Sequence, residues 1–505
     1  MRITNGMMIN NTLSHINQNK LNVDKYNTQE ATGKKIQRPS DDPVIAVRAL
    51  RFRSQLAEMA QYLEKNIPDA DAWLKLTEEI LDGVSGTLSN MTKYINQGSN
   101  DTNFLDDREA IVKTLKGFRD TVFHDANQDY GGRRIFSGYK TDTDMTFSST
   151  DKTVKYKIEE NFTFSDFDTI SKVFDGVDVT ADPLVEIDAK DMPTDKTDIH
   201  RIRLAYDKLT PKTAAGNTAG AAEAPVVKID GTATAVKVIS PDTNGNYVDE
   251  TGAQVNPYKP GDNEIYFLAD SGEMIFGVTQ YQNMRNKEIS VEYYKEGFEK
   301  GDLRPEHYFD CTRYEADGTT IDVEFESHQQ DINYTINFNQ RLKVNSEGRD
   351  LFSHAVLRDL DEVINAVQDL DLINDKITQI KKMQEDPAYK NQEKELASML
   401  KAAQKEYDLQ QDIVQKRFEK SITLYTEHQR NVDAEIADIG SRDSRCQLNK
   451  ARLTEQKTTL DELKSSNEDI NLPETIINLS AASMVYDASL SAASKVITKS
   501  LLDYL

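Results

Sequence analysis

The 505-residue chain has few cysteines and no long apolar run, and each absence narrows what the protein can be. Its two cysteines, Cys311 and Cys446, cannot form a disulfide framework. Because no run of about 18 apolar residues occurs, the sequence predicts no transmembrane helix. The segment Met1–Gly6 lacks the basic start and the apolar stretch of a secretory signal. We therefore expect a cytoplasmic protein, or one exported without signal cleavage.

Basic residues are scarce relative to acidic ones. Lys and Arg number 61 against 85 Asp and Glu, which gives a formal net charge of −24. Phosphate binding needs concentrated positive charge, so the composition disfavours a nucleic-acid partner and docking on an anionic membrane surface. Residues 1–45 and 471–505 are almost neutral, and the rest of the chain carries the negative charge. This distribution suits ends that become buried and a body that faces water, or reflects chance in two short segments.

Catalytic and metal-binding motifs are missing as well. The chain contains neither a GxxxxGK[ST] phosphate loop nor an HExxH zinc motif. His307 and Cys311 could share a helical face around a metal, but no third ligand is near and the local sequence is strand-like. Asp242–Asn246 resembles the start of a calcium loop, yet an Asn-Gly hairpin turn explains its spacing better. The sequence therefore predicts no enzyme, no cofactor and no metal site.

Helical periodicity dominates the first part of the chain. From Ile67 to Ile95, apolar or small residues recur at alternating steps of three and four, which predicts a coiled-coil seam. Asp42 suits an N-cap and Pro43 suits a first turn, so this helix is expected to begin there. Pro68 lies inside the pattern and predicts a kink, because proline lacks the N–H group that an uninterrupted helix needs.

Further helices are expected on both sides of the middle region. Ile111–Val122 is an amphipathic segment that the paired glycines Gly131-Gly132 should end. A final helix should begin at Pro473. Near the C-terminus a second seam repeats every seven residues; its members are Ile439, Cys446, Leu453 and Leu460, with Val432, Ile436 and Leu463 beside them.

Between about Tyr139 and Glu347 the pattern changes to short alternating runs separated by Asp, Gly and Asn. Runs such as 154–158 and 332–336 predict strands, and 210–224, rich in Ala, Thr and Gly, predicts a flexible loop. A β-rich insert thus interrupts a helical framework. The two coiled-coil halves at opposite ends of the chain are expected to pack against each other. The charged segment 374–411, interrupted by Pro387, should lengthen a helix pair.

The N-terminal segment has too little apolar surface to be stable alone. Its anchors among residues 1–45 are Ile9, Leu13, Ile16 and Val23. Burying each yields roughly 1.5–3 kcal/mol, whereas ordering each residue costs about 1–2 kcal/mol of backbone entropy. We infer that both ends of the chain are disordered in the monomer and fold by packing on neighbouring subunits.

The segment Thr32–Pro43, with the sequence TGKKIQRPSDDP, closely resembles the characteristic turn of the flagellin-like hook-associated proteins. It has the form KxIxRPSDDP, which is similar to the hook–filament junction members of this family, whereas filament flagellins usually carry SGxRINSAxDD. Other matches follow in the family's order: Met1–Thr4, Met7-Met8, Arg53–Leu56, Asp71–Leu74, Gly132–Gly138, Ile332–Phe352 and Ser500–Leu505. The resemblance covers about 1–140, 332–370 and 412–505.

This resemblance implies an α+β, flagellin-like fold, with long antiparallel coiled-coil helices from both chain ends and an inserted β-rich domain. Residues 1–43 and 471–505 would form the inner tube, 44–140 and 332–470 the helical core, and 141–331 an outer domain of one or two subdomains. The protein would be an extracellular adaptor ring at the hook–filament junction. Its partners would be identical subunits, hook-associated protein 1, flagellin and an export chaperone of the flagellar type III apparatus.

Two sets of residues have a functional and a purely structural interpretation. The turn Arg38, Pro39, Ser40, Asp41, Asp42 and Pro43 either joins the inner and outer helical layers or simply caps a helix. The C-terminal stripe Tyr486, Leu490, Ile497, Leu501 and Leu505 either also serves the chaperone or packs only in the assembled tube. Rival functions are a filament flagellin, an enzyme carried on the filament and a cytoplasmic coiled-coil scaffold.

Overall fold

The computed structural model describes residues 5–100, 104–173, 176–177, 179, 184, 186–187, 196–210, 224–242, 245–315 and 317–496. The chain divides into two compact units. Unit 1 comprises Met1–Asp71, Tyr334–Leu342 and Asp443–Leu505, and unit 2 comprises Ala72–Asn333 and Lys343–Arg442. The matched ends Met1–Thr4 and Ser500–Leu505, and most of the loop expected at 210–224, lie outside the described residues. The predicted division into inner tube, helical core and outer domain has three parts where the structure shows two units, and it stays a prediction.

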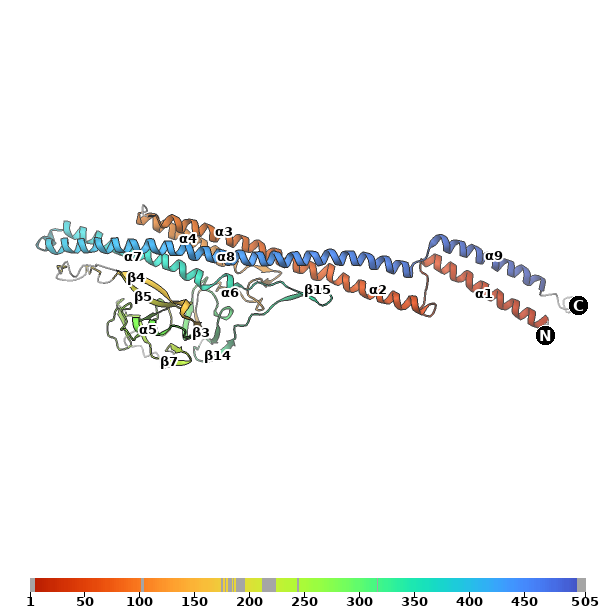
Figure 1. Cartoon of the computed structure of the whole chain (residues 1–505), viewed down its shortest axis with the longest axis horizontal. Helices are drawn as coiled ribbons and strands as arrows, with labels where there is room; N and C mark the ends of the chain where they lie inside the picture. The colour runs from red at the N-terminus through yellow and green to blue at the C-terminus, as the bar shows by residue number, and fades with distance from the viewer. Residues whose placement is uncertain are drawn as a thin grey trace. The chain divides into compact units, whose positions relative to one another are not determined.

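Helices form both parts of the chain that flank the middle region, and one short helix lies within that region (Figure 1). They are α1 (Asn5–Thr32), α2 (Pro43–Gln61), α3 (Ile67–Gly98), α4 (Leu105–Asp125), α5 (Val278–Asn283), α6 (Gly348–Leu351), α7 (His354–Glu385), α8 (Glu393–Glu468) and α9 (Leu472–Val496). The last of these begins one residue before the expected Pro473.

The strands lie between α4 and α6 in the sequence. They are β1 (Asp129–Tyr130), β2 (Arg133–Arg134), β3 (Asp151–Phe162), β4 (Asp168–Val173), β5 (Lys196–Arg203), β6 (Val226–Ile229), β7 (Thr232–Thr234), β8 (Lys237–Pro241), β9 (Tyr247–Val248), β10 (Ile265–Leu268), β11 (Glu273–Phe276), β12 (Ile289–Phe298), β13 (Asp310–Tyr314), β14 (Ile321–Phe325), β15 (Asn333–Asn337) and β16 (Gln340–Lys343). The expected β-rich insert is therefore present.

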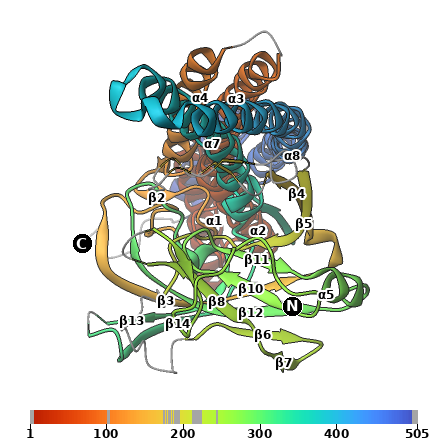
Figure 2. The ribbon, with the colours of Figure 1, turned by 90° about the vertical axis from the view of Figure 1, so that its left-hand side faces the viewer.

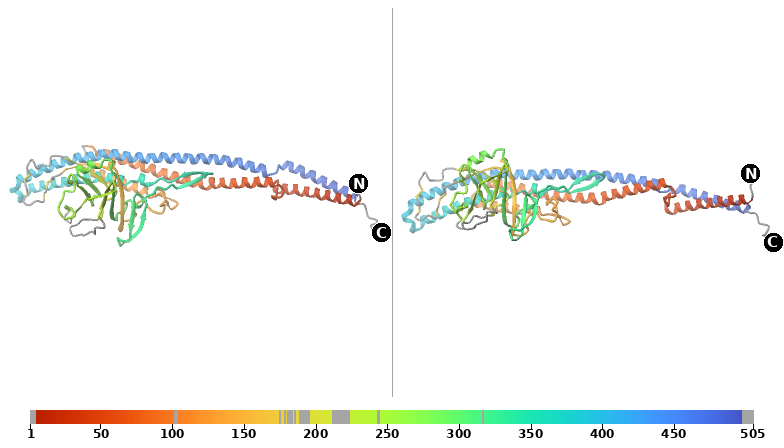
Figure 3. Two further views of the ribbon diagram at one scale, coloured as in Figure 1. Left: turned by 60° about the horizontal axis from the view of Figure 1, so that its bottom comes forward. Right: turned by 90° about the horizontal axis from the view of Figure 1, so that it is seen from below.

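In unit 1, α1 and α9 lie side by side along their length, as Figures 1 and 3 both show. Asn19 on α1 donates to the Ser489 hydroxyl on α9 over 2.6 Å. Gly33 ends α1 in the left-handed conformation, with φ of 70°, and its N–H group bonds to the Gln29 carbonyl over 2.8 Å. Glycine suits this position because it has no Cβ to clash there.

A local change of helix type accommodates Pro68, which lacks the N–H group that a regular α-helix needs at this position. Residues Tyr62–Asn66 between α2 and α3 form one π-helical turn, in which the Ile67 N–H group bonds back to the Tyr62 carbonyl. A π turn changes the hydrogen-bond register and so relieves the missing donor and the ring clash of Pro68. The helix therefore continues through the proline, with the irregularity directly before it.

The predicted seam of α3 is buried along its length. Every seam position from Ile67 to Ile95 is at most 1% exposed, including Thr77, whose hydroxyl bonds to the Trp73 carbonyl over 2.7 Å. In unit 2, Ser85 bonds to Asp433 on α8 over 2.6 Å. A Cβ on Gly98 would lie 2.3 Å from the Phe418 ring. Since the α8 partners fall in number as the α3 residues rise, the two helices run antiparallel.

In unit 1, the same antiparallel pairing continues. Gln447 donates to Asp71 over 2.6 Å, and Cys446 packs against the Ile67 carbonyl with a sulfur–oxygen distance of 3.9 Å. The expected seam members Ile439, Cys446 and Leu453 are buried, whereas Leu460 is half-buried. Leu463 was expected in the seam but is 48% exposed. The next position of the seven-residue repeat after Leu460 is Asn467, whose side chain bonds to the Ile45 carbonyl over 3.1 Å.

The expected end of the helix after Ile111 was wrong. Helix α4 ends at Asp125, and Gly131 and Gly132 instead form the tight turn between β1 and β2. Both glycines have positive φ, of 60° and 80°, which a two-residue hairpin turn requires and which glycine adopts without strain. The hairpin covers the buried Trp73, since Tyr130 meets the indole edge-on at 5.7 Å and Arg133 lies over it at 5.0 Å.

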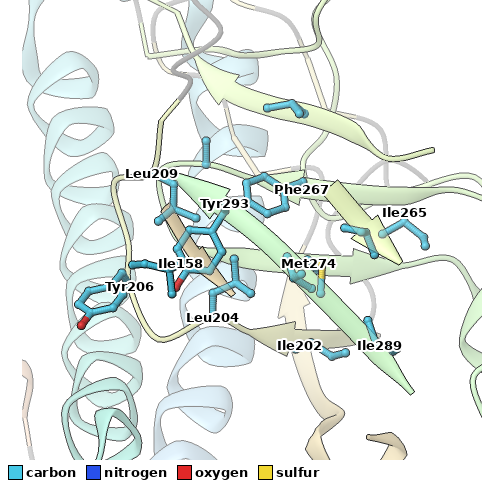
Figure 4. Packing of buried hydrophobic residues seen from close by; sticks show 14 of the residues in the cluster. Ile158, Ile202, Leu204, Tyr206, Leu209, Ile265, Phe267, Met274, Ile289 and Tyr293 are labelled. Atoms are coloured by element: carbon cyan, nitrogen blue, oxygen red, sulfur yellow. The ribbon is translucent and has the colours of Figure 1, made fainter. Parts of the chain in front are cut away.

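Two six-stranded sheets build the insert of unit 2 (Figure 2). Their strand orders are β4-β5-β11-β10-β8-β9 and β14-β13-β3-β12-β6-β7, and all pairs are antiparallel except β8 with β10. Figure 4 shows the core that the two sheets share. Ile158 and Tyr293 enter it from one sheet, and Phe267 and Met274 enter it from the other.

A buried ion network attaches this insert to helices α7 and α8 within unit 2. Arg201 on β5, with a 2% exposed side chain, pairs with Asp168 over 3.0 Å, with Glu362 on α7 over 2.8 Å and with Glu273. Glu362 also faces Arg417 on α8 over 3.5 Å. Buried charges are tolerated only when paired, so the network fixes one orientation of the sheet on the helices.

Helices α7 and α8 form the expected lengthened pair. A 3-10 turn, Pro387–Gln392, separates them where Pro387 was expected to interrupt the helix. Near this turn, Ile380 on α7 packs in one cluster with Leu396 and Met399 on α8. The predicted α+β fold, with long helices from both chain ends and an inserted β-rich region, is confirmed.

Candidate assembly interface

The turn between α1 and α2 is organised by two neighbouring aspartates. Asp42 caps α2, and its carboxylate accepts the N–H groups of Val44 at 2.9 Å and Ile45 at 3.2 Å. Asp41 accepts the N–H groups of Gln37 at 3.0 Å and Arg38 at 2.9 Å. These backbone donors lower the pKa of Asp41. The predicted helix cap is therefore confirmed, and the turn has a fixed geometry of its own.

The same turn is tied to the segment between α8 and α9. Lys34 forms an antiparallel bridge with Asp469, and the Lys35 N–H group bonds to the Glu468 carbonyl over 2.7 Å. The Ile470 N–H group returns a bond to the Gly33 carbonyl over 3.0 Å. The chain passes twice between the α1–α9 pair and the longer helices α2 and α8, and these bonds join the two connecting segments to each other. We call residues 33–42 with 465–470, together with Arg53, the joint.

Glu468 is the buried centre of the joint. Its side chain is 4% exposed and accepts a two-pronged contact from Arg53 on α2, at 2.9 and 2.7 Å. Lys34 lies 3.5 Å away from the same carboxylate. The Arg53 hydrogen bonds lower the pKa of Glu468, and the Lys34 hydrogen bond likewise lowers that of Asp469. The joint is therefore held by charge-assisted bonds that need both carboxylates ionised.

Other residues of the predicted turn face solvent. Arg38, Pro39 and Ser40 are exposed, and within the described part of the chain no bond or ion pair involves the Arg38 side chain. The Arg38 N–H group donates to Asp41, and its guanidinium charge also helps to lower the pKa of that carboxyl group. Asp41 and Asp42 account for the local geometry, so Arg38 is left available for another molecule.

The predicted apolar positions on α1 and α9 are only partly covered. Ile9, Ile16 and Val23 are half-buried, and Leu13 is 45% exposed. On α9, Tyr486 is half-buried and Leu490 is 43% exposed. Ile497, Leu501 and Leu505 of the predicted stripe lie outside the described residues.

Large apolar side chains are concentrated on the exposed faces of unit 1. On α1, α2 and α9 they are Met7, Met8, Leu13, Leu21, Val44, Val47, Leu50, Leu472, Ile476, Ile477, Met484, Val485 and Leu490. Single exposed apolar residues are ordinary, but this many on three helices indicate surfaces that another molecule covers. The arrangement suits assembly and contains no chemistry of its own.

Sequence reasoning missed the residues that hold the joint together. Arg53 was singled out only as a family match, and Glu468, Asp469 and Asn467 were not singled out. A Glu-Asp pair that ends four residues before the expected helix start at Pro473 is an ordinary solvated pattern. Only its partner Arg53, 415 residues away in the sequence, makes it a buried site.

The candidate metal pair does not form a site. His307 lies in a 3-10 turn, and its ring bonds to the Asp144 carbonyl over 2.9 Å, while Cys311 is buried on β13. Among the described residues, no group of three or more His, Cys, Asp or Glu side chains is placed to hold a metal ion. Within the same residues, no helix has the length and apolar character needed to cross a membrane.

The N-terminal part of the chain matches a known family. Residues 3–141 match the model of the bacterial flagellin N-terminal helical region. The matched segment contains α1 to α4, the turn and the β1–β2 hairpin. The predicted resemblance to the flagellin-like hook-associated proteins is confirmed.

Individual relatives are similar over the same part. Flagellar hook-associated protein 3 of Escherichia coli K12 is 34% identical over 145 residues, which are 28% of this chain and 45% of the relative. A flagellin of Clostridium tyrobutyricum is 27% identical over 173 residues, 34% of this chain and 45% of that protein. The alignments thus span about half the length of these relatives. The solved flagellar hook-associated protein-3 of Legionella pneumophila covers 82% of this chain and 97% of its own, with 11% identity and a TM-score of 0.30.

Proposed function

We propose that the protein is a structural subunit of the bacterial flagellum, which forms an adaptor ring between the hook-side junction and the flagellin filament. The observation that carries this proposal is the 34% identity to hook-associated protein 3, compared with 27% to a flagellin. The turn KxIxRPSDDP, which differs from the usual flagellin form, supports the same choice. The protein has no catalytic role in this proposal.

The exposed apolar faces of α1 and α9 support assembly. In a tube of identical subunits, neighbouring α1–α9 pairs would cover Leu13, Leu490 and the other apolar side chains that a single chain leaves in contact with water. The almost neutral ends suit burial in such a tube, and the acidic remainder suits its outside. Hook-associated protein 1 would bind on the hook side, and flagellin on the filament side.

The alternative is a subunit of the filament itself. It is favoured by the match to the Clostridium flagellin, which extends over more residues than the match to hook-associated protein 3. The two functions differ in where the protein lies on the flagellum, because a junction ring occupies one level and a filament subunit repeats along the whole length.

Immunogold electron microscopy of intact flagella, with antibody to residues 141–331, distinguishes these functions. We expect one band of label where the hook meets the filament. Label along the whole filament would identify a flagellin instead. Unlabelled flagella from a strain that expresses the protein would overturn both and favour a cytoplasmic coiled-coil scaffold.

Export before assembly would require a chaperone of the flagellar type III apparatus, and export would proceed without a cleaved signal peptide. The stripe on α9, which includes Tyr486 and Leu490, is the proposed binding face, since an apolar helix face is what a chaperone groove would cover. Truncation at Pro473 should abolish chaperone pull-down. Pull-down equal to that of the full chain would contradict this assignment and leave the stripe a role in the tube alone.

A further inference from the structure

The hairpin β15–β16 presents an aromatic ring at its tip. Phe338 stands in the two-residue turn and is 71% exposed, whereas Ile336 and Leu342 on the strands are buried. Asn66 in the π turn donates to the Thr335 carbonyl over 2.8 Å, which fixes the hairpin against the helix. Turn tips are normally polar, so a large exposed ring on a fixed hairpin is placed to contact another molecule.

A pocket of about 660 Å³ lies beside this ring within unit 1. Met59 from α2, Tyr62 from the π turn and Leu460 from α8 give it an apolar floor, which Phe338 extends. Two exposed glutamates, Glu58 and Glu455, line it as well. The pocket therefore combines an apolar floor with two carboxylates in its lining. We call it the hairpin pocket.

The first turns of α2 also expose apolar side chains, but the charged residues beside them are basic. Val44, Val47 and Leu50 are 51–62% exposed and recur every three residues, so they share one face of the helix. Arg48 and Arg51 flank them and are exposed, and the structure gives neither side chain an ion pair among the described residues. We call these five residues the α2 stripe.

The stripe cannot fill the pocket of its own chain. Val47 and Glu58 lie on the same helix, eleven residues apart, which is roughly 16 Å along its axis at 1.5 Å per residue. A second copy of the chain must therefore supply one of the two surfaces. Since stripe and pocket are different surfaces, the contact would be head-to-tail, which closes into a ring or continues as a helix.

We propose that the α2 stripe of one copy docks in the hairpin pocket of the next, with Phe338 as the central anchor. Val44, Val47 and Leu50 would cover the apolar floor, and Arg48 and Arg51 would face Glu58 and Glu455. This inference rests on the proposed function, because it names the contact that joins neighbouring subunits. The complementary charges favour this occupant over an unrelated apolar partner, and they fix the register of the two copies.

Cross-linking in assembled flagella tests the contact. The full chain would carry Val47→Cys and Gln456→Cys, and isolated junctions would be treated with a short bismaleimide reagent. A link within one chain would join Val47 to a pocket whose nearest α2 residue, Gln55, lies eight residues or roughly 12 Å away, and such a link yields no multimer, so a ladder reports only links between chains. The native Cys311 and Cys446 are at most 6% exposed and do not compete.

We expect a ladder of linked multimers from the double variant and none from Val47→Cys alone. The matched control is Val47→Cys with Leu448→Cys, because Leu448 is 62% exposed on α8 but lies outside the pocket. An equal ladder from this control, or dimers from Val47→Cys alone, would overturn the proposal. Gold label at the junction without a ladder would overturn the contact and leave the proposed function standing. Absence of label would overturn the function itself.

Charge reversal provides a second test that does not need a reactive cysteine. Arg48→Glu with Arg51→Glu should lower the gold label at the junction at least tenfold, because four carboxylates would then face each other. Adding Glu58→Lys and Glu455→Lys should restore the label to within about twofold, since the pairing is only inverted. If the fourfold variant assembles no better than the double one while its monomer melts like the native protein, the proposed pairing is wrong.

Discussion

At the scale of single residues, the joint depends on Glu468. Its carboxylate is almost fully buried, and two hydrogen bonds from Arg53 compensate for that burial. Breaking such a pair is more costly than the pair is worth, because the remaining charge is left without a partner. Removing Arg53 would therefore leave the buried Glu468 carboxylate without an equivalent donor.

Arg53→Ala should lower the free energy of unfolding by about 1–3 kcal/mol, since Glu468 keeps only the more distant Lys34. Arg48→Ala, on the same helix and without an ion pair, is the control and should change it by less than about 0.5 kcal/mol. Urea denaturation of the monomer measures both. Equal effects of the two substitutions would show that the Arg53 contact contributes nothing.

The joint should also weaken in acid. Because the pKa values of Glu468 and Asp469 are lowered in the folded protein, their contribution is present above the ordinary pKa of a carboxyl group. It is lost as the pH falls below about 4, through the lowered values. The stability difference between the native protein and Arg53→Ala should therefore shrink from pH 7 to pH 3. A constant difference would contradict the pairing.

Gly98 on α3 is needed for a close approach to α8. A Cβ there would lie 2.3 Å from the Phe418 ring, so Gly98→Ala should cost about 1–3 kcal/mol by overpacking. Gly83 on the same helix has no atom within 4 Å of a Cβ, so Gly83→Ala should instead stabilise by about 0.5–1 kcal/mol. Thermal unfolding of both variants measures these effects. Stabilisation by Gly98→Ala would show that α3 and α8 leave room for a methyl group at this position.

At the scale of elements, the turn before α2 separates two roles. Asp42 caps the helix, whereas the Arg38 side chain is exposed and forms no hydrogen bond or ion pair within the described part of the chain. Asp42 thus stabilises α2, and the Arg38 side chain is left to contact another molecule during assembly. The two interpretations of the turn are compatible because different residues carry them.

Arg38→Ala should impair assembly at the junction while leaving the melting temperature of the monomer unchanged. Asp42→Ala is its counterpart and should destabilise the monomer by about 1 kcal/mol, since it leaves two N–H groups of α2 without an acceptor. Calorimetry and counting of labelled junctions measure the two effects. Equal damage by Arg38→Ala to folding and assembly would favour a purely local role for the turn.

At the scale of the whole molecule, the chain combines a well-packed unit 2 with helices in unit 1 that leave apolar side chains exposed. Helices with so little buried surface are marginal in water by themselves. The monomer and the assembled protein are therefore expected to differ at the two ends of the chain.

Limited proteolysis should cut the monomer within residues 1–43 and 471–505 and leave the β-rich insert intact. The same segments should resist the protease in isolated junctions, because neighbouring subunits would cover them. Mass spectrometry of the fragments locates the cuts. Equal protection of the ends in monomer and junction would contradict folding on neighbouring subunits.

The sequence by itself determined the features that depend on local patterns. The three-four spacing from Ile67 to Ile95 predicted a buried seam, and Asp42-Pro43 predicted the start of α2, because helix periodicity and capping act over a few residues. Only the tertiary structure decided that Glu468 is buried against Arg53, since nothing near Glu468 in the sequence marks its partner. It also decided that a π turn accommodates Pro68 and that Leu463 is exposed, because these outcomes depend on the folded backbone and on what surrounds each side chain.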